Sequence, residues 1–137
     1  MLKITAEVYG EMIRQCRQEY PNEACGYLAG EGNVATRAYS VVNEHQSPTS
    51  YVMNSAGQAV AQRDMREKRL SNLAIYHSHV ATEAYPSRRD IENALAVQDF
   101  FEGYYVLVSL KTEPPKTRVF EIRDGFPKEV PWEEVQS

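Results

Sequence analysis

The chain has 137 residues, of which 42% are hydrophobic and 25% are charged. These values are typical of a soluble globular protein, and we expect a single domain over residues 1–137. The net charge of −4 argues against a nucleic-acid partner, which normally requires a basic surface. No apolar run reaches the roughly 18–20 residues that cross a bilayer, so no membrane partner is expected.

The start of the chain and its cysteines bear on its location. Residues 1–5 carry neither a long apolar stretch nor a small-residue cleavage site, so we expect no signal peptide. Cys16 and Cys25 are the two cysteines, and they form no C-x-x-C pair. We therefore expect reduced thiols in a cytoplasmic protein, and no zinc site built from thiolates.

The first elements are a helix and a hairpin. Apolar residues recur at helical spacing over residues 5–19, with Thr5 suited to the N-cap and Pro21 ending the helix. Two strands follow, at 24–30 and 34–43, and a glycine-containing turn joins them. This pattern predicts an antiparallel β-hairpin.

The middle of the chain is predicted to be a loop and a second helix. Residues 44–53 are expected to form an exposed loop, and Asn54 or Ser55 is suited to cap a helix that runs to about Arg69. Its basic residues are interpreted as a solvated face. Its thin apolar stripe consists of Ala59, Val60, Met65 and Leu70.

The second half begins with a strand that ends in histidines, residues 73–79. A third helix is predicted from Ser87 to near Gly103. The residues expected to face inward on this helix are Ile91, Ala94, Leu95, Val97 and Phe101. The strongly apolar segment 104–110 is predicted to be a central strand.

The last third of the chain reads as a hairpin and a tail. Segments 117–123 and 126–130 flank an Asp-Gly turn, and the second of them is expected at a sheet edge. The tail from Pro131 either packs on the domain or frays. The expected fold class is therefore α/β, with helices packed on a central mixed sheet.

Two of the three histidines end the strand at 73–79. Side chains alternate along a strand, so His77 and His79 point to the same face about 7 Å apart. A helix that starts at Ser87 brings Asp90, in its first turn, close to the end of this strand. Two imidazoles and one carboxylate leave a metal one open position, which is the arrangement of a catalytic zinc rather than a structural one.

A simpler interpretation of the same residues is structural. Ser87-x-x-Asp90 before an apolar run is a capping box, which explains both residues without a metal. The histidines would then be ordinary strand residues. The capping role does not exclude the metal, because a capping residue can also face a site.

Together these residues resemble the JAMM (MPN+) metalloprotease family, in its small stand-alone prokaryotic form. The sequence has H-S-H, seven further residues and S-x-x-D, with a glutamate upstream near a strand. The matching residues are Glu23, His77, Ser78, His79, Ser87 and Asp90. Segment 22–30 is also similar to the early strand of that family. One departure is Val80, which stands where the family usually has proline.

The resemblance implies a fold, a cofactor and roles for the residues. The fold would be a curved mixed sheet flanked by helices, similar to the cytidine deaminase architecture. His77, His79 and Asp90 would bind one Zn²⁺ ion, with water in the fourth position. Glu23 would be the general base, and Ser87 would donate a hydrogen bond to the developing oxyanion.

The resemblance also implies a substrate class. Small members of the family are expected to cut a peptide or isopeptide bond at the C-terminal tail of a ubiquitin-like or sulfur-carrier protein. Such an enzyme would remove residues beyond a terminal Gly-Gly or release an amino acid formed on the carrier. The extended tail would lie in a groove past the metal, with residues 44–54 as a wall. Arg88 and Arg89 flank the site, and they either hold a substrate carboxylate or are ordinary helix-surface residues.

Two other functions are weighed against this one. A metal-free MPN-like interaction module would keep the fold as a scaffold, but a scaffold does not need His77, His79 and Asp90 together. A zinc deaminase would need H-x-E and P-C-x-x-C signatures, which the sequence lacks.

Overall fold

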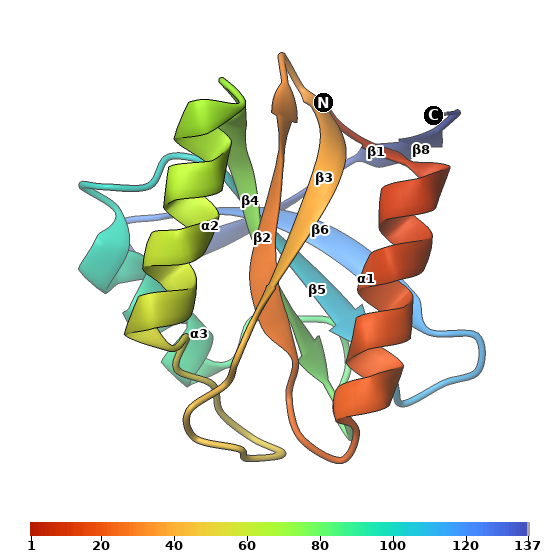
Figure 1. Cartoon of the computed structure of the whole chain (residues 1–137). Coiled ribbons are helices and arrows are strands. Elements are labelled where there is room, and N and C mark those ends of the chain that lie inside the picture. The colour runs from red at the N-terminus through yellow and green to blue at the C-terminus, as the bar shows by residue number, and fades with distance from the viewer. Residues whose placement is uncertain (137) are drawn as a thin grey trace.

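The computed structural model describes residues 1–136. Figure 1 shows its helices packed around a strongly curved sheet. The elements in chain order are β1 Leu2–Thr5, α1 Ala6–Glu19, β2 Cys25–Glu31, β3 Val34–Val41, α2 Ser55–Glu67, β4 Ser71–His79, α3 Arg88–Val97, β5 Tyr104–Ser109, β6 Lys116–Arg123, β7 Phe126–Val130 and β8 Trp132–Val135. None of the described helices is long and apolar enough to cross a membrane.

One eight-stranded mixed sheet runs through the domain. Its strand order is β7-β6-β5-β4-β2-β3-β1-β8. Strand β4 lies in the interior, antiparallel to β2 and parallel to β5. The pairing places Cys25 opposite His77 and Leu107 beside His77. The end of β4 is therefore held on both sides by hydrogen-bonded strands.

Alternating side chains divide the interior between the two faces of the sheet. On one face, Leu28 and Tyr76 pack against the buried residues of α1. On the other face, Tyr27 packs with Met65 of α2, and Leu107 packs with Ala94 of α3. Figure 1 shows α1 and α2 on opposite sides of β2 and β3. Because Tyr76 points toward α1, its neighbour His77 points to the α2 and α3 face.

The expected helices form, with two differences in how they pack. Helix α3 ends at Val97 rather than near Gly103, and Leu95 and Val97 are exposed rather than inward. On α2 the buried residues are Ala61 and Met65, whereas Ala59 and Val60 of the predicted stripe are exposed. Both helices use a narrower apolar face than the sequence pattern indicates.

The predicted strands and hairpins are present, and two further strands join them. The turn at Asp124-Gly125 has positive φ at both residues, 52° and 83°, which suits a two-residue hairpin. The tail packs as β8, which pairs in parallel with β1 at one edge of the sheet. Strand β7 is the other edge, as predicted. The expected class, a mixed sheet flanked by helices, is confirmed.

Candidate metal centre

Three buried side chains converge where β4 ends and α3 begins. His77 and His79 come from β4, and Asp90 comes from the first turn of α3. His77 Nε2 lies 3.1 Å from His79 Nε2 and 3.1 Å from Asp90 Oδ2. His79 Nε2 lies 3.0 Å from the same oxygen. The three atoms thus form a nearly equilateral triangle, with a buried side chain behind each corner.

The triangle has the size and chemistry of a zinc site. Zinc bonds of about 2.0–2.1 Å in tetrahedral geometry put neighbouring ligand atoms about 3.3 Å apart, close to the separations observed. His79 Nδ1 lies 2.8 Å from the Glu83 carbonyl oxygen, which can only accept, so Nδ1 carries the proton. When the ring of His79 is neutral, its Nε2 therefore presents a lone pair to a carboxylate oxygen. This contact is unfavourable unless a proton or cation lies between them, and the residues present fit a divalent metal.

Burial and mutual contact set the charge state of the three groups. Burial alone would lower the pKa of His79, but its hydrogen bonds with Asp90 and the Glu83 carbonyl outweigh it and raise that pKa, so metal binding would displace a proton from this ring. Burial lowers the pKa of His77 despite its contact with Asp90. Burial alone would raise the pKa of Asp90, but the hydrogen bonds from His77 and His79 outweigh it and hold that pKa well below its usual range. Metal binding requires a neutral imidazole and an ionised carboxylate. His77 and Asp90 are therefore in the forms that binding needs at neutral pH.

The start of α3 fixes the carboxylate. Ser87 is the N-cap, and its Oγ accepts a hydrogen bond from the Asp90 backbone N–H at 3.1 Å. In return, Asp90 Oδ2 accepts from the Ser87 backbone N–H at 2.9 Å. The predicted capping box is thus present, and its carboxylate oxygen is the one that faces the histidines. Ser87 itself is exposed, so its hydroxyl can also meet a substrate.

Glu23 lies just before β2, the antiparallel neighbour of β4, and so reaches the centre from the segment beside His79. Cys25 pairs with His77, so continuing the register by two residues sets Glu23 opposite His79. Ser78 supports this continuation, because its backbone N–H and its Oγ both bond the main chain of Ala24. Burial raises the pKa of Glu23 to about 7, partly offset by the charge of His79. Glu23 is 5% exposed.

The predicted loop 44–53 closes over this side of the centre. Asn43 holds it, donating from Nδ2 to the carbonyl oxygens of Glu23 and Ser50 at 3.1 and 3.0 Å. The backbone N–H of Glu23 donates to the Ser47 carbonyl oxygen at 2.9 Å. The ring of Tyr51 stacks on His77, with centroids 4.6 Å apart. The loop therefore fixes both the general-base candidate and one imidazole.

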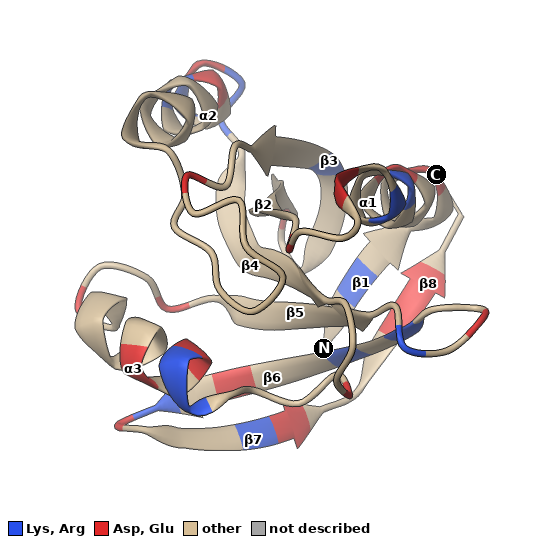
Figure 2. Cartoon of the chain, turned by 90° about the horizontal axis from the view of Figure 1, so that it is seen from below, with Lys and Arg blue, Asp and Glu red and all other residues tan. Residues whose placement is uncertain are grey.

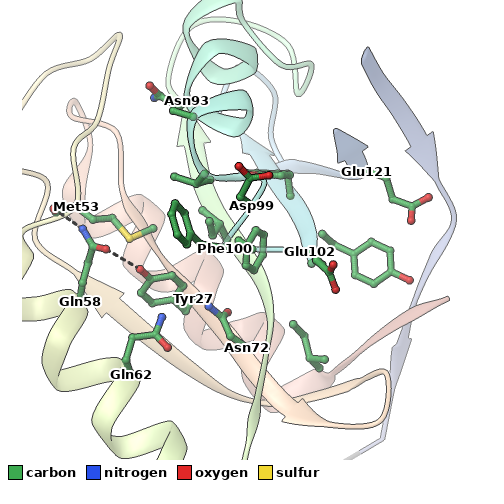
Figure 3. A pocket seen from close by; sticks show the side chains of 18 of the residues that line it. Tyr27, Met53, Gln58, Gln62, Asn72, Asn93, Asp99, Phe100, Glu102 and Glu121 are labelled. Carbon is green, nitrogen blue, oxygen red and sulfur yellow. Dashed lines mark hydrogen bonds between the residues drawn. The ribbon is translucent and has the colours of Figure 1, made fainter. Parts of the chain in front are cut away.

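A cavity of about 1000 Å³ lies on the same face of the sheet as the candidate centre, and none of the five predicted site residues lines it. Figure 3 shows Tyr27, Gln58 and Gln62 on one side of it and Asn93 and Phe100 on the other. Tyr51, Val52 and Met53 also line it, so the predicted wall segment forms one end of the cavity. That end adjoins the metal centre, because Tyr51 is in contact with His77.

The structure brings all five predicted site residues to one place. His77, His79 and Asp90 form the triangle, Ser87 caps the helix that carries Asp90, and Glu23 lies beside His79. Sequence reasoning gave no role to Tyr51 or to the Glu83 carbonyl that orients His79. Neither residue follows from a periodic pattern, since both belong to loops whose paths depend on tertiary packing.

Comparison with known proteins places the chain in a family. A family model described as prokaryotic homologs of the JAB domain matches residues 5–123. The CysO-cysteine peptidase of Mycobacterium tuberculosis is 39% identical over 96% of this chain and 89% of its own length. A probable TtuB-protein conjugate cleaving protease of Thermus thermophilus is 40% identical over 56% of this chain and 52% of its own length.

Solved structures have the same fold. A protein of Desulfitobacterium hafniense matches with a TM-score of 0.87 and 32% identity, over 100% of this chain and 94% of its own. A structure described as a JAMM metalloprotease-like zinc site in the proteasome and signalosome matches with a TM-score of 0.63 and 17% identity, over 99% of both chains. The fold is thus the JAB1/MPN fold, and the chain belongs to the prokaryotic JAMM family.

Proposed function

We propose that this chain is a zinc-dependent hydrolase that cleaves a peptide or isopeptide bond at the C-terminal tail of a ubiquitin-like or sulfur-carrier protein. The observation that carries the proposal is the convergence of His77, His79 and Asp90 within 3.0–3.1 Å of one another, beside the buried carboxyl of Glu23. The peptidase names of the relatives support this reaction class.

His77 Nε2, His79 Nε2 and Asp90 Oδ2 are the proposed zinc ligands. Bound there, zinc would lower the pKa of a water molecule toward 7 and polarise the scissile carbonyl. Three protein ligands leave room for water and substrate. The Glu83 carbonyl keeps His79 in the tautomer that directs Nε2 toward the ion.

Glu23 is the proposed general base. Its carboxylate accepts a proton from the attacking water and returns it to the leaving nitrogen as the carbon–nitrogen bond breaks. In the metal-free protein burial raises the pKa of Glu23 to about 7, and a cation bound beside it would lower that pKa and favour the ionised form that accepts the proton. The hydrogen bonds that fix the backbone of Glu23 to Asn43 and Ser47 keep the carboxyl in one place.

Ser87 is the proposed oxyanion donor. Its Oγ accepts from the Asp90 N–H, which leaves the hydroxyl proton free to donate. Such a donor strengthens its hydrogen bond as negative charge develops on the carbonyl oxygen. The exposed position of Ser87 gives that oxygen access to it.

The cavity beside the centre is the proposed path of the carrier tail. Its end at Tyr51 adjoins the metal ligands, and Ile75 of β4 lines it farther along.

The proposed location is the cytoplasm. Cys16 and Cys25 are free buried thiols, and reduced thiols are typical of cytoplasmic proteins. The carrier substrate would therefore also be cytoplasmic.

Metal analysis and a cleavage assay together test the proposal. The purified protein should hold one zinc per chain and should cleave a CysO–cysteine conjugate, and a chelator should abolish the cleavage until zinc is returned. A protein with no affinity for zinc would instead support the metal-free interaction module. Zinc binding without cleavage of any carrier tail would refute the proposed substrate class.

A further inference from the structure

The start of α3 carries a cation that the proposed machinery does not use. Arg89 is exposed and directly precedes the ligand Asp90 in the first turn of the helix. Figure 2 shows basic positions at this end of α3, next to acidic ones. The neighbouring Arg88 pairs with Glu92, with Nε 3.8 Å from Oε2. Within residues 1–136, Arg89 makes no such ion pair.

The position of Arg89 in the first turn of α3 brings its charge close to the candidate centre. Residues four apart share a helix face, so Arg89 lies one turn before Asn93, which lines the cavity. Arg89 itself does not line the cavity, but it lies between the part of α3 that does and the start of the helix, beside Asp90. Its charge also acts on the Glu23 carboxyl, which lies across the centre from α3. Arg88, paired along the outer surface, has a side chain that is 93% exposed.

The leaving group of the substrate determines which chemical group would lie near Arg89. If the bond before a single C-terminal residue is cut, the free carboxylate of that residue lies within about 4 Å of the scissile carbon. In a lysine isopeptide the main chain of the leaving residue is about twice as far away. The charges of Asp90 and Glu23 would together balance that of a bound zinc ion, so a further positive charge would stabilise a substrate carboxylate there.

We propose that Arg89 binds the α-carboxylate of a single amino acid joined to the carrier tail, and so selects such conjugates over isopeptides and longer extensions. This inference rests on the proposed function and adds a specificity residue to it. The guanidinium would form a charge-assisted, bidentate contact with the carboxylate, for which its fork geometry is suited.

The test compares two conjugates that differ in one charge, CysO–cysteine and CysO–cysteinamide. The zinc-loaded wild-type protein should cleave the acid with a kcat/KM about 10- to 100-fold above that of the amide, mainly through KM. Arg89→Ala should lower kcat/KM for the acid far more than for the amide, so that the preference between the two is lost. Arg89→Lys should keep part of it.

A matched control and a binding measurement complete the test. Arg88→Ala removes a neighbouring charge and should keep the full preference. The zinc-loaded Glu23→Gln protein should bind the acid more tightly than the amide in calorimetry, and adding Arg89→Ala should remove the difference. Equal cleavage of acid and amide by the wild type, or a lost preference in Arg88→Ala alone, would overturn the inference. Cleavage of neither conjugate by the wild type would refute the proposed function, and the inference with it.

Discussion

The backbone N–H of Ser87 donates to Asp90 Oδ2 at 2.9 Å, and that oxygen also lies 3.0 Å from His79 Nε2. One carboxylate oxygen thus closes the cap of α3 and faces the imidazoles. The same hydrogen bond therefore caps the helix and orients the Asp90 carboxylate toward the histidines. Replacing Asp90 should therefore lower both the stability of α3 and the affinity for the metal, whereas a change of the Ser87 side chain keeps this backbone hydrogen bond.

Replacing Ser87 by alanine should affect both stability and turnover, because it removes a helix cap and the proposed oxyanion donor. The loss of an N-cap hydrogen bond costs about 1 kcal/mol of unfolding free energy. The loss of an oxyanion donor should lower kcat by about 10²- to 10³-fold while zinc is retained. Urea unfolding and turnover of CysO–cysteine measure the two effects. Thr5→Ala is the control, because Thr5 caps α1 in the same way far from the centre. It should cost similar stability and keep full turnover, and a wild-type kcat in Ser87→Ala would contradict the oxyanion role.

Zinc should stabilise the folded protein through the three ligands. A ligand that binds the folded state at 100 times its dissociation constant adds about 2.7 kcal/mol to the unfolding free energy. His77→Ala should lose this increment in urea titrations with and without zinc. His45→Ala is the matched control, because His45 is an exposed histidine whose ring Nδ1 lies 3.0 Å from Ser50 Oγ. An equal zinc increment in His77→Ala and wild type would show that the metal binds elsewhere.

The metal-free protein should lose stability as the pH rises, because of Glu23. Burial raises the pKa of Glu23 from 4.5 to about 7, so between these values the folded state holds a proton that the unfolded state releases. The stabilisation is fully present below pH 4.5 and is lost as the pH rises through 7. It amounts to at most about 3 kcal/mol.

Unfolding with urea in the presence of a chelator, at pH 5 and pH 8, measures this loss. Other groups of the centre also titrate, so the comparison is with Glu23→Gln, which removes one titration and keeps the shape. The wild type should lose more stability than Glu23→Gln between the two pH values. Identical pH dependence in the two proteins would mean that the Glu23 carboxyl is not buried.

Ser78 should matter for stability although it binds no metal. Its Oγ accepts from the buried Ala24 backbone N–H at 2.8 Å, and this contact continues the pairing of β4 with the segment that carries Glu23. Ser78→Ala leaves that N–H without a partner and should cost about 1–3 kcal/mol. Ser71→Ala, at the exposed start of the same strand, should change stability by less than about 0.5 kcal/mol. Equal effects of the two substitutions would contradict the structural role.

Much of the fold follows from local patterns in the sequence. The helix after Thr5, the hairpin of β2 and β3 and the central strand β5 each have a clear periodicity or turn signal, and each is present. Strand β1 has no local signal, and the sequence leaves open whether the tail packs, because β1 and β8 are four-residue segments whose partners are distant in sequence. Helix α3 was predicted too long because apolar residues continue at helical spacing beyond Val97.

The sequence predicts the three candidate metal ligands from local patterns, but it does not predict the other residues of the site in this way. His77 and His79 follow from strand alternation, and Asp90 follows from the capping box that starts the next helix. Glu23 has no local signal, and only the resemblance pointed to it, because its position depends on the pairing of β2 with β4. Tyr51 was not assigned a role, because its loop depends on the side-chain hydrogen bonds of Asn43.

The central claim is that Glu23 makes the metal centre a hydrolase. The most direct test is the zinc content of Glu23→Gln together with its rate of CysO–cysteine cleavage. The account predicts one zinc per chain, as in the wild type, and a cleavage rate reduced by about 10²- to 10⁴-fold. A Glu23→Gln protein that holds its zinc and cleaves at the wild-type rate would contradict it.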